Sequence, residues 1–231
     1  MNDTAGKFFG AEDALKLEKA WEEPLHRYSE LLASCSVARL TGSRDADEIY
    51  ELHIRDSLYS VPLLPEEGEV IDVGSGGGLP GVVWAICRPG LSVTLLDSVR
   101  KKCAALRDIA AALELKNIST VWGRCEEYAL SARERYSFAA ARALAHAGVV
   151  AEYLAPLVAR GGRLIAFKGP KGAAELEEVG EKWNRLGLSQ PRVLSYAEGR
   201  NYFFVVWEKN SPCPSFYPRK PGLALSKNWW K

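Results

Sequence analysis

The feature that most constrains the fold is a short apolar run that ends in a cluster of glycines. Residues 70–73 read Val-Ile-Asp-Val, and the segment 74–81 contains five glycines. An apolar run of this length is typical of a buried parallel strand. Glycines let the backbone approach a ligand closely and take positive φ, and a helix over 80–88 would offer unpaired N–H groups beside it. The sequence therefore predicts a strand, a ligand-binding loop and a helix in succession.

Apolar periodicity on both sides of this loop predicts alternating strands and helices. Further strands are expected at residues 91–96, 119–122, 138–141, 163–167 and 202–208. Helices are expected at residues 11–34, 45–60, 99–113, 145–160 and 172–187. Alternation over short links indicates an α/β fold with a doubly wound, mostly parallel sheet. The chain is accordingly divided into an N-terminal helical extension (1–62), an α/β domain (63–210) and a basic C-terminal tail (211–231).

Two carboxylates flank the glycine loop and indicate its ligand. Asp97 ends the second strand, where a carboxylate can accept hydrogen bonds from both hydroxyls of a ribose. Asp72 precedes the first glycine and would repel the pyrophosphate of NAD, whereas it would attract the sulfonium and ammonium of S-adenosylmethionine. The loop also lacks the Lys and Ser or Thr of a P-loop. These features favour S-adenosylmethionine, although Asp72 could instead cap the backbone amides of the loop.

The amino-acid composition limits the class of protein to which the chain can belong. The 231 residues carry 30 Lys and Arg against 29 Asp and Glu, so the net charge of +1 draws no nucleic acid to the whole surface, and an anion site must be local. Five cysteines without a Cys-x-x-Cys pair, and three histidines, argue against a metal site. The sequence shows neither a signal peptide nor an apolar run of about 20 residues. We expect a cytoplasmic protein that binds no membrane.

Short motifs recur in a specific order along the chain. They are Leu40-Thr41, Arg44-Asp45, His53-Ile54-Arg55-Asp56-Ser57-Leu58, the loop from Ile71 to Gly81, Leu95-Leu96-Asp97-Ser98 with Lys101-Lys102, Arg124-Cys125-Glu126-Glu127, Ala141-Arg142-Ala143, Lys168-Gly169, and Tyr217-Pro218-Arg219-Lys220-Pro221-Gly222. In these motifs the chain resembles the bacterial small-subunit ribosomal RNA guanine-N7 methyltransferases, also called glucose-inhibited division protein B. It departs from the family's pattern at residues 36–39, at Trp84 and at residues 226–231.

The resemblance implies the fold, the reaction and most of the site. It implies a Rossmann-like class I methyltransferase that transfers a methyl group from S-adenosylmethionine to N7 of a guanine in small-subunit (16S) ribosomal RNA. The implied partner is this RNA or the assembling small ribosomal subunit, and we expect the protein to act as a monomer. The cofactor residues that it implies are Gly74, Gly76 and Leu79 at the methionine end, Asp97 at the ribose, Cys125 and Glu126 beside the adenine, and Arg142 next to cofactor and target.

The chemistry of guanine N7 limits what catalysis requires. N7 has a lone pair and no proton, so attack on a methyl group needs no general base, and the enzyme contributes positioning. The candidate catalytic residues are Arg142, Arg124 and Lys168, which follow predicted strands and could hold O6 or a phosphate; each could instead make a structural pair. His53 and Asp56 lie on one helical face, where they either form a hydrogen-bonded pair that docks the extension or border the target pocket. Cys125 is expected to be a small neighbour of the adenine rather than a reactive thiol.

Two basic stretches favour an RNA partner over a small molecule. The acid-free segment 153–174 contains Arg160, Arg163, Lys168 and Lys171, and the C-terminal region adds Lys209, Arg219, Lys220, Lys227 and Lys231. Such residues bind phosphates, although they can also form a solvated face. Trp229 and Trp230 could stack on bases or pack onto the domain. The competing functions are a small-molecule methyltransferase of the same fold, a nicotinamide-dependent oxidoreductase and a non-catalytic RNA-binding assembly factor.

Overall fold

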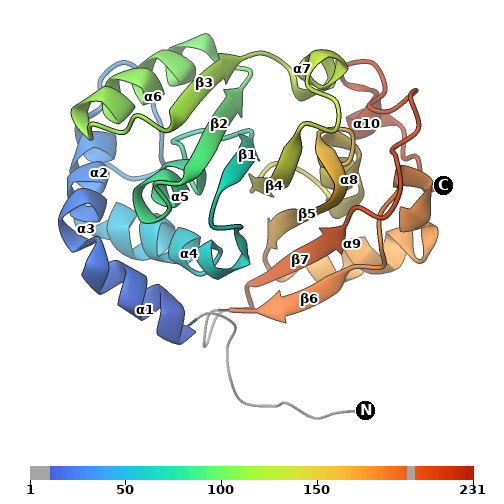
Figure 1. Ribbon diagram of the computed structural model, residues 1–231, viewed down its shortest axis with the longest axis horizontal. Helices are drawn as coiled ribbons and strands as arrows, with labels where there is room; N and C mark the ends of the chain where they lie inside the picture. Colours follow the sequence, from blue (N-terminus) through green and yellow to red (C-terminus); the bar gives the residue numbers. More distant parts are fainter. Residues whose placement is uncertain (1–10, 197–200) are drawn as a thin grey trace.

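The computed structural model describes residues 11–196 and 201–231 of the chain, and these build one sheet with helices on both faces (Figure 1). The sheet has seven strands in the order β3-β2-β1-β4-β5-β7-β6. The first five strands pair in parallel, whereas β7 runs antiparallel to both β5 and β6. The strands are β1 (Gly68–Val73), β2 (Leu91–Asp97), β3 (Ile118–Trp122), β4 (Tyr136–Arg142), β5 (Val158–Lys168), β6 (Arg192–Ser195) and β7 (Phe203–Glu208). The predicted doubly wound, mostly parallel sheet is confirmed.

The helices are divided between the two faces of the sheet. The chain forms α1 (Ala11–Ala20), α2 (Glu22–Ser34), α3 (Ala46–Ile49), the π-helical turn η1 (Tyr50–Ile54), α4 (Arg55–Leu58), the 3-10 turn η2 (Val61–Leu63), α5 (Gly81–Cys87) and α6 (Arg100–Ala112). It continues with α7 (Cys125–Ser131), α8 (Ala147–Leu154), α9 (Gly172–Val179), the 3-10 turn η3 (Lys182–Leu186) and α10 (Leu223–Ser226). In Figure 1 the N-terminal helices α1 to α4, in blue and cyan, lie on the left, and the C-terminal helices α9 and α10, in orange and red, lie on the right.

Alternation along the strands creates two separate hydrophobic cores. In β1, Val70 packs into a core with α2, α5 and α6, while Ile71 and Val73 pack into a second core with α7 and α8. This follows from the two-residue period of a strand, which sends successive side chains to opposite faces. A strand that is apolar on both faces is the pattern expected for a parallel sheet covered on both sides.

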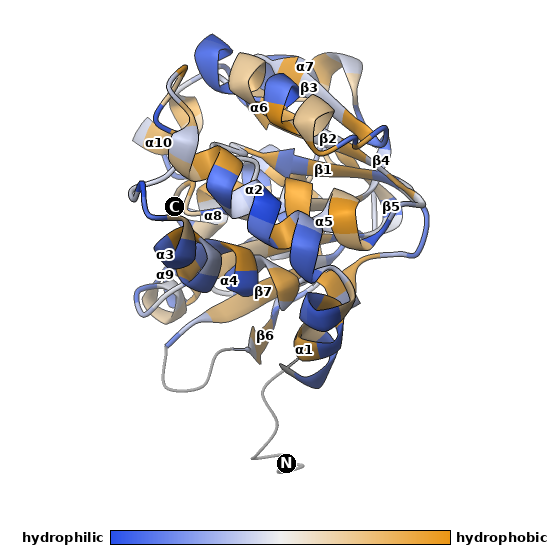
Figure 2. Cartoon of the chain, turned by 90° about the vertical axis from the view of Figure 1, so that its left-hand side faces the viewer, coloured by the Kyte–Doolittle hydropathy of each residue, from blue (hydrophilic) through white to orange (hydrophobic). Residues whose placement is uncertain are grey.

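Helix α5 is buried along its whole length between the sheet and the N-terminal extension. All seven of its residues are buried, and Figure 2 shows it mostly in the hydrophobic colour. The indole N–H of Trp84 donates to Oγ of Ser60 at 2.8 Å, and the ring packs edge-on against Phe138. Trp84, a departure from the family pattern, therefore helps to dock the extension onto the domain.

Several predicted boundaries were wrong for local reasons. The helix expected over 145–160 ends at Leu154, because Pro156 follows and the chain enters β5 at Val158. The helix expected over 172–187 is interrupted at Gly180, which has a φ of +61°. The helix expected over 11–34 breaks at Trp21. Helix α7 and strand β6 are both short and were not predicted.

The C-terminal region returns to the face of the sheet that carries α8. The indole N–H of Trp229 donates to the carbonyl of Gly148 at 2.8 Å, and the ring of Trp230 stacks on His146 with centroids 4.8 Å apart. Both tryptophans are buried, so they pack onto the domain. Within the described ranges, no helix is long and apolar enough to cross a membrane.

Candidate functional site

Two cavities lie at the carboxyl ends of the parallel strands, which is where open α/β sheets bind ligands. The smaller cavity encloses about 110 Å³ between the end of β2, the start of α7 and α10. The larger cavity encloses about 600 Å³ between the glycine loop, the N-terminal extension and the end of β5. Gly74 lines both, so the two cavities adjoin at the glycine loop. We call them the small cavity and the large cavity.

The glycine loop requires its glycines for conformation and for space. Gly74 has a φ of +71° and Gly76 a φ of +57°, a region that favours glycine. A Cβ on Gly74 would stand 2.6 Å from Cδ1 of Leu144, which lines the small cavity. The loop is fixed over the end of β2, because the N–H groups of Gly74 and Ser75 both donate to the carbonyl of Leu96.

Asp97 is held in place by the same loop. Its side chain is 6% exposed and lines the small cavity. Oδ2 accepts from the Gly76 N–H and Oδ1 from the Val99 N–H, both at 2.8 Å. A carboxylate offers about four lone-pair sites, so both oxygens retain capacity toward hydroxyls of a ligand.

Asp72 lies beneath the loop and lines neither cavity. Its Oδ2 accepts from the N–H of Gly81 at 3.0 Å, which is the capping contact considered as its alternative role. Its Oδ1 accepts no hydrogen bond from the residues that the structure describes. Burial raises the pKa of Asp72 from an ordinary 3.8 to about 7, and Asp97 adds to the rise against the opposing effects of the Gly81 N–H and Arg142.

The start of α7 supplies three neighbouring residues to the small cavity. Arg124 is exposed at the N-cap position. The thiol of Cys125 donates to the carbonyl of Tyr153, and burial raises the pKa of this thiol far above neutrality, so it stays protonated and unreactive. Glu126 accepts from the backbone N–H of Gly222 at 3.1 Å and so connects the cavity to the C-terminal region.

Arg142 ends β4 in the wall of the large cavity. Its Nη1 donates to Oδ2 of Asp56 at 3.2 Å and approaches the carbonyl of His53 at 3.5 Å. Oδ1 of Asp56 accepts from the hydroxyl of Tyr196 at 2.9 Å. The possible hydrogen bond between His53 and Asp56 does not form within the described residues; Asp56 docks the extension through Arg142 and Tyr196 instead, and both His53 and Asp56 line the large cavity. Burial and Arg142 lower the pKa of His53, which keeps it neutral.

Lys168 also lines the large cavity, but its ammonium is already paired. Nζ donates to the carbonyl of Ala145 and to Oε2 of Glu175, both at 2.6 Å, and the side chain is 8% exposed. The same Glu175 oxygen accepts from the N–H of Ala147 at 2.7 Å. Lys168 therefore fixes the loop that follows β4. This is the structural pair expected from the sequence as the alternative to a catalytic role.

Sequence reasoning missed the aromatic wall of the large cavity. This wall contains Phe167, Tyr196 and Tyr202. Tyr196 follows the short edge strand β6, and its ring stacks on Phe204 with centroids 4.0 Å apart. Tyr28 of α2 lies in the helix expected over 11–34, and its hydroxyl donates to the carbonyl of Gly77 at 2.6 Å. None of these contacts leaves a periodic signal in the sequence.

The basic residues do not form one continuous patch. Arg160 and Lys168 lie at opposite ends of β5, roughly 25 Å apart at the usual rise of a strand. Lys209 is buried against Glu134 at 3.1 Å, and Arg219 pairs with the fully buried Glu152 at 2.6 Å. These two cations therefore stabilise the fold. The basic residue that borders the large cavity together with Lys168 and Arg142 is Lys102.

Comparison with a solved structure identifies the fold. The crystal structure of a predicted O-methyltransferase from Agrobacterium tumefaciens superimposes with a TM-score of 0.55 at 15% identity, covering 68% of this chain and 81% of that one. With the sheet order and the glycine loop, this likeness defines a Rossmann-like methyltransferase fold.

Comparison with known sequences then defines the family. The family model described as GidB, rRNA small subunit methyltransferase G, matches residues 22–203. The ribosomal RNA small subunit methyltransferase G of Moorella thermoacetica is 37% identical over 195 residues, 81% of each chain. The protein of the same name from Thermotoga neapolitana is 34% identical over 221 residues, 94% of this chain and 95% of that one. The chain belongs to the GidB family of rRNA small subunit methyltransferase G.

Proposed function

We propose that the protein transfers a methyl group from S-adenosylmethionine to N7 of a guanine in small-subunit ribosomal RNA, either free or in the assembling subunit. The observation that carries the proposal is the junction of the two cavities at Gly74. A cofactor with its adenosine end in the small cavity would have its sulfonium at this junction, facing a base in the large cavity. The names of the relatives support ribosomal RNA as the substrate.

The chain's residues fit S-adenosylmethionine better than NAD. A dinucleotide places its pyrophosphate at the N-terminus of the helix after the glycine loop. In this chain the first N–H of α5, that of Gly81, already donates to the buried carboxylate of Asp72, so it is not available to a phosphate. Oδ1 of Asp72 accepts no hydrogen bond from the described part of the chain, and a carboxylate beneath the loop favours a cation above it. When bound, S-adenosylmethionine supplies an electrophilic methyl group on a positively charged sulfur.

Each cofactor residue has a role consistent with its position. Asp97 would accept from the ribose hydroxyls, because its carboxylate faces the small cavity in a fixed orientation. Gly74 and Gly76 would bring the backbone close to the methionine end, beside Leu79. Cys125 and Glu126 would border the adenine.

The large cavity fits a nucleobase. Its volume of about 600 Å³ lies within the range of about 300–1,000 Å³ that is usual for ligand pockets. Phe167 and Tyr202 could stack on an unpaired base, which is how proteins hold single-stranded RNA. The neutral His53 adds no charge there. Lys102 at the border could hold a phosphate.

Arg142 would orient the guanine. A guanidinium has five N–H donors, and within the described residues Nη1 is the Arg142 nitrogen that donates, to Asp56 and His53. The remaining donors could bind O6 and leave N7 free for the methyl group. Since N7 carries no proton, no side chain needs to act as a base, and the protein's contribution is alignment. Arg124 and Lys168 would support the RNA or the loop rather than the reacting atoms.

Transfer of a labelled methyl group tests the proposal. The purified protein is incubated with methyl-labelled S-adenosylmethionine and with small-subunit RNA or assembled small subunits. We expect label in the RNA with the wild type and with Asp108→Ala, an exposed carboxylate control, and little label with Arg142→Lys. Label in a small-molecule fraction instead would establish a small-molecule methyltransferase. RNA binding without transfer would establish an assembly factor.

A further inference from the structure

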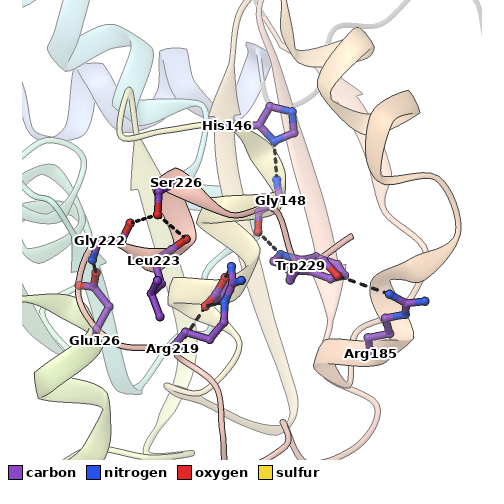
Figure 3. Close-up of polar contacts among 10 residues, drawn as sticks. Glu126, His146, Gly148, Arg185, Arg219, Gly222, Leu223, Ser226 and Trp229 are labelled. Atoms are coloured by element: carbon purple, nitrogen blue, oxygen red, sulfur yellow. Dashed lines mark hydrogen bonds and ion pairs between the residues drawn. The ribbon is translucent and has the colours of Figure 1, made fainter. Parts of the chain in front are cut away.

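Residues 217–231, which we call the C-terminal strap, contact Glu126 of α7 and Gly148 of α8 (Figure 3). The strap lies within the basic C-terminal tail (211–231) predicted from the sequence. Its contacts fix it at several points to the face of the sheet that carries the second core. These anchors determine which of its side chains reaches the cavity.

The first anchors lie before α10. Nε and Nη2 of Arg219 donate to the two carboxylate oxygens of Glu152 at 2.9 and 2.6 Å, and Glu152 is completely buried in α8. The N–H of Gly222 donates to Glu126 at 3.1 Å. Gly222 has a φ of +83°, so the chain turns there into α10. Because Glu126 itself lines the small cavity, this bond fixes α10 directly beside it.

The last anchors lie after α10. Trp229 donates to the carbonyl of Gly148, and Trp230 covers the same glycine so closely that a Cβ there would stand 2.4 Å from the indole ring. The carbonyl of Trp229 also accepts from Arg185, as Figure 3 shows. The strap is therefore held on both sides of α10, and its terminal residues brace the first turn of α8, next to Leu144 and Ala145 of the cavity wall.

Between the anchors, α10 presents one apolar side chain to the small cavity. Leu225 lines this cavity together with Asp97, Cys125 and Glu126. It is 63% exposed, so it contributes little to the hydrophobic core. Leu223 of the same helix is 40% exposed and does not line the cavity. An exposed leucine that a fixed strap holds at the mouth of a cavity is positioned to bury itself against a bound ligand.

We propose that the C-terminal strap completes the cofactor site, with Leu225 closing over the adenosine end of S-adenosylmethionine. This inference rests on the proposed function. The apolar face of an adenine is a suitable partner for Leu225, because both surfaces leave water when they meet. The contact forms equally in the ground state and the transition state, since the adenosine end does not take part in the reaction. Its loss therefore raises KM and leaves kcat unchanged.

The test compares Leu225→Ala with Leu223→Ala, a matched control from the same helix. Calorimetry with S-adenosylmethionine and with adenosine, methyl-transfer kinetics and thermal unfolding are measured for both variants. Leu225→Ala is expected to raise Kd for both ligands and KM for the cofactor about three- to tenfold, with unchanged kcat and Tm. Leu223→Ala is expected to match the wild type in every measurement.

The other outcomes overturn the inference in distinguishable ways. If Leu225→Ala binds both ligands as tightly as the wild type, the strap is no part of the site and the proposed function stands. If it weakens S-adenosylmethionine but not adenosine, Leu225 does not contact the adenosine end. If the wild type itself fails to bind S-adenosylmethionine, the proposed cofactor fails and the inference fails with it.

Discussion

Nη1 of Arg142 lies 3.2 Å from Oδ2 of Asp56, an ion pair that joins the end of β4 to α4 of the N-terminal extension. Both side chains are mostly buried, so the pair limits the cost of placing a guanidinium at the large cavity. Tyr196 donates to the other oxygen of Asp56 and fixes it from the opposite side. The extension thus serves the site by orienting Arg142.

The pair predicts coupled effects on the methyl-transfer step. Arg142→Lys and Asp56→Asn should each slow single-turnover transfer by about tenfold or more, because the guanidinium fork or its orientation is lost, while cofactor affinity changes little. The double variant should be no slower than the worse single variant. Glu51→Gln, which removes an exposed partner of Arg55, is the control. Fully additive effects would show that the two residues act independently.

Asp97→Ala should weaken S-adenosylmethionine binding by roughly 1–3 kcal/mol. The variant leaves two ribose hydroxyls unpaired and removes the acceptor for the N–H groups of Gly76 and Val99. Isothermal calorimetry measures the change, and Asp108→Ala is the exposed control. An unchanged affinity in a folded Asp97→Ala protein would contradict the ribose assignment.

The raised pKa of Asp72 predicts that the stability of the protein depends on pH. Its pKa rises from 3.8 in the unfolded chain to about 7 in the folded protein, so the folded state binds the proton more tightly. The free energy of unfolding should therefore fall as the pH rises from about 4 to about 7. Asp72→Asn keeps an acceptor for the Gly81 N–H. Because an amide does not ionise, the free energy of unfolding of this variant does not fall over this pH range for that reason. It should be more stable than the wild type by roughly 2–4 kcal/mol at about pH 8, and the difference should nearly vanish at about pH 4.

Urea unfolding across this pH range measures the difference between the two proteins. The same substitution should weaken S-adenosylmethionine binding, because the negative charge beneath the loop is lost. A stability difference that does not change with pH would mean that Asp72 is ionised throughout.

Gly148→Ala should destabilise the protein by about 1–3 kcal/mol. The added Cβ would stand 2.4 Å from the ring of Trp230 and would displace the end of the strap. The direction of this change in stability is informative, because alanine normally stabilises a helix by about 1 kcal/mol relative to glycine. In a protein that already carries Trp230→Ala, adding Gly148→Ala should cause no further destabilisation. Gly123→Ala is the control for urea unfolding, because its new Cβ would have no described atom within 4 Å apart from its chain neighbours. A stabilised Gly148→Ala protein would show that the ring does not hold this position.

The sequence predicts much of this site because parallel strands bring their carboxyl ends to one edge. The apolar run of β1 and the glycines after it predict the loop, and the end of β2 predicts Asp97 beside it. The end of β4 likewise brings Arg142 to the same edge. These predictions need only the strand periodicity and the topology that it implies.

The remaining features depend on tertiary contacts that have no local signal. Leu225 lies at the small cavity because the strap is anchored on both sides of α10, by Glu126 and Glu152 before it and by Gly148 after it. Lys168 was expected to be available to RNA, but Glu175, one turn into α9, neutralises it. Strand β6 has only four residues and no buried side chain, so its pattern does not identify it as a strand.

Mapping of the methylated base tests the central claim most directly. After single turnover with labelled S-adenosylmethionine, the ribosomal RNA is digested and its nucleosides are separated. The proposed chemistry predicts label in 7-methylguanosine, formed at a rate that does not follow ionisation of the base between about pH 6 and pH 9. Label in any other nucleoside, or a rate that rises steeply with ionisation of a ring nitrogen, would contradict attack by the unprotonated N7.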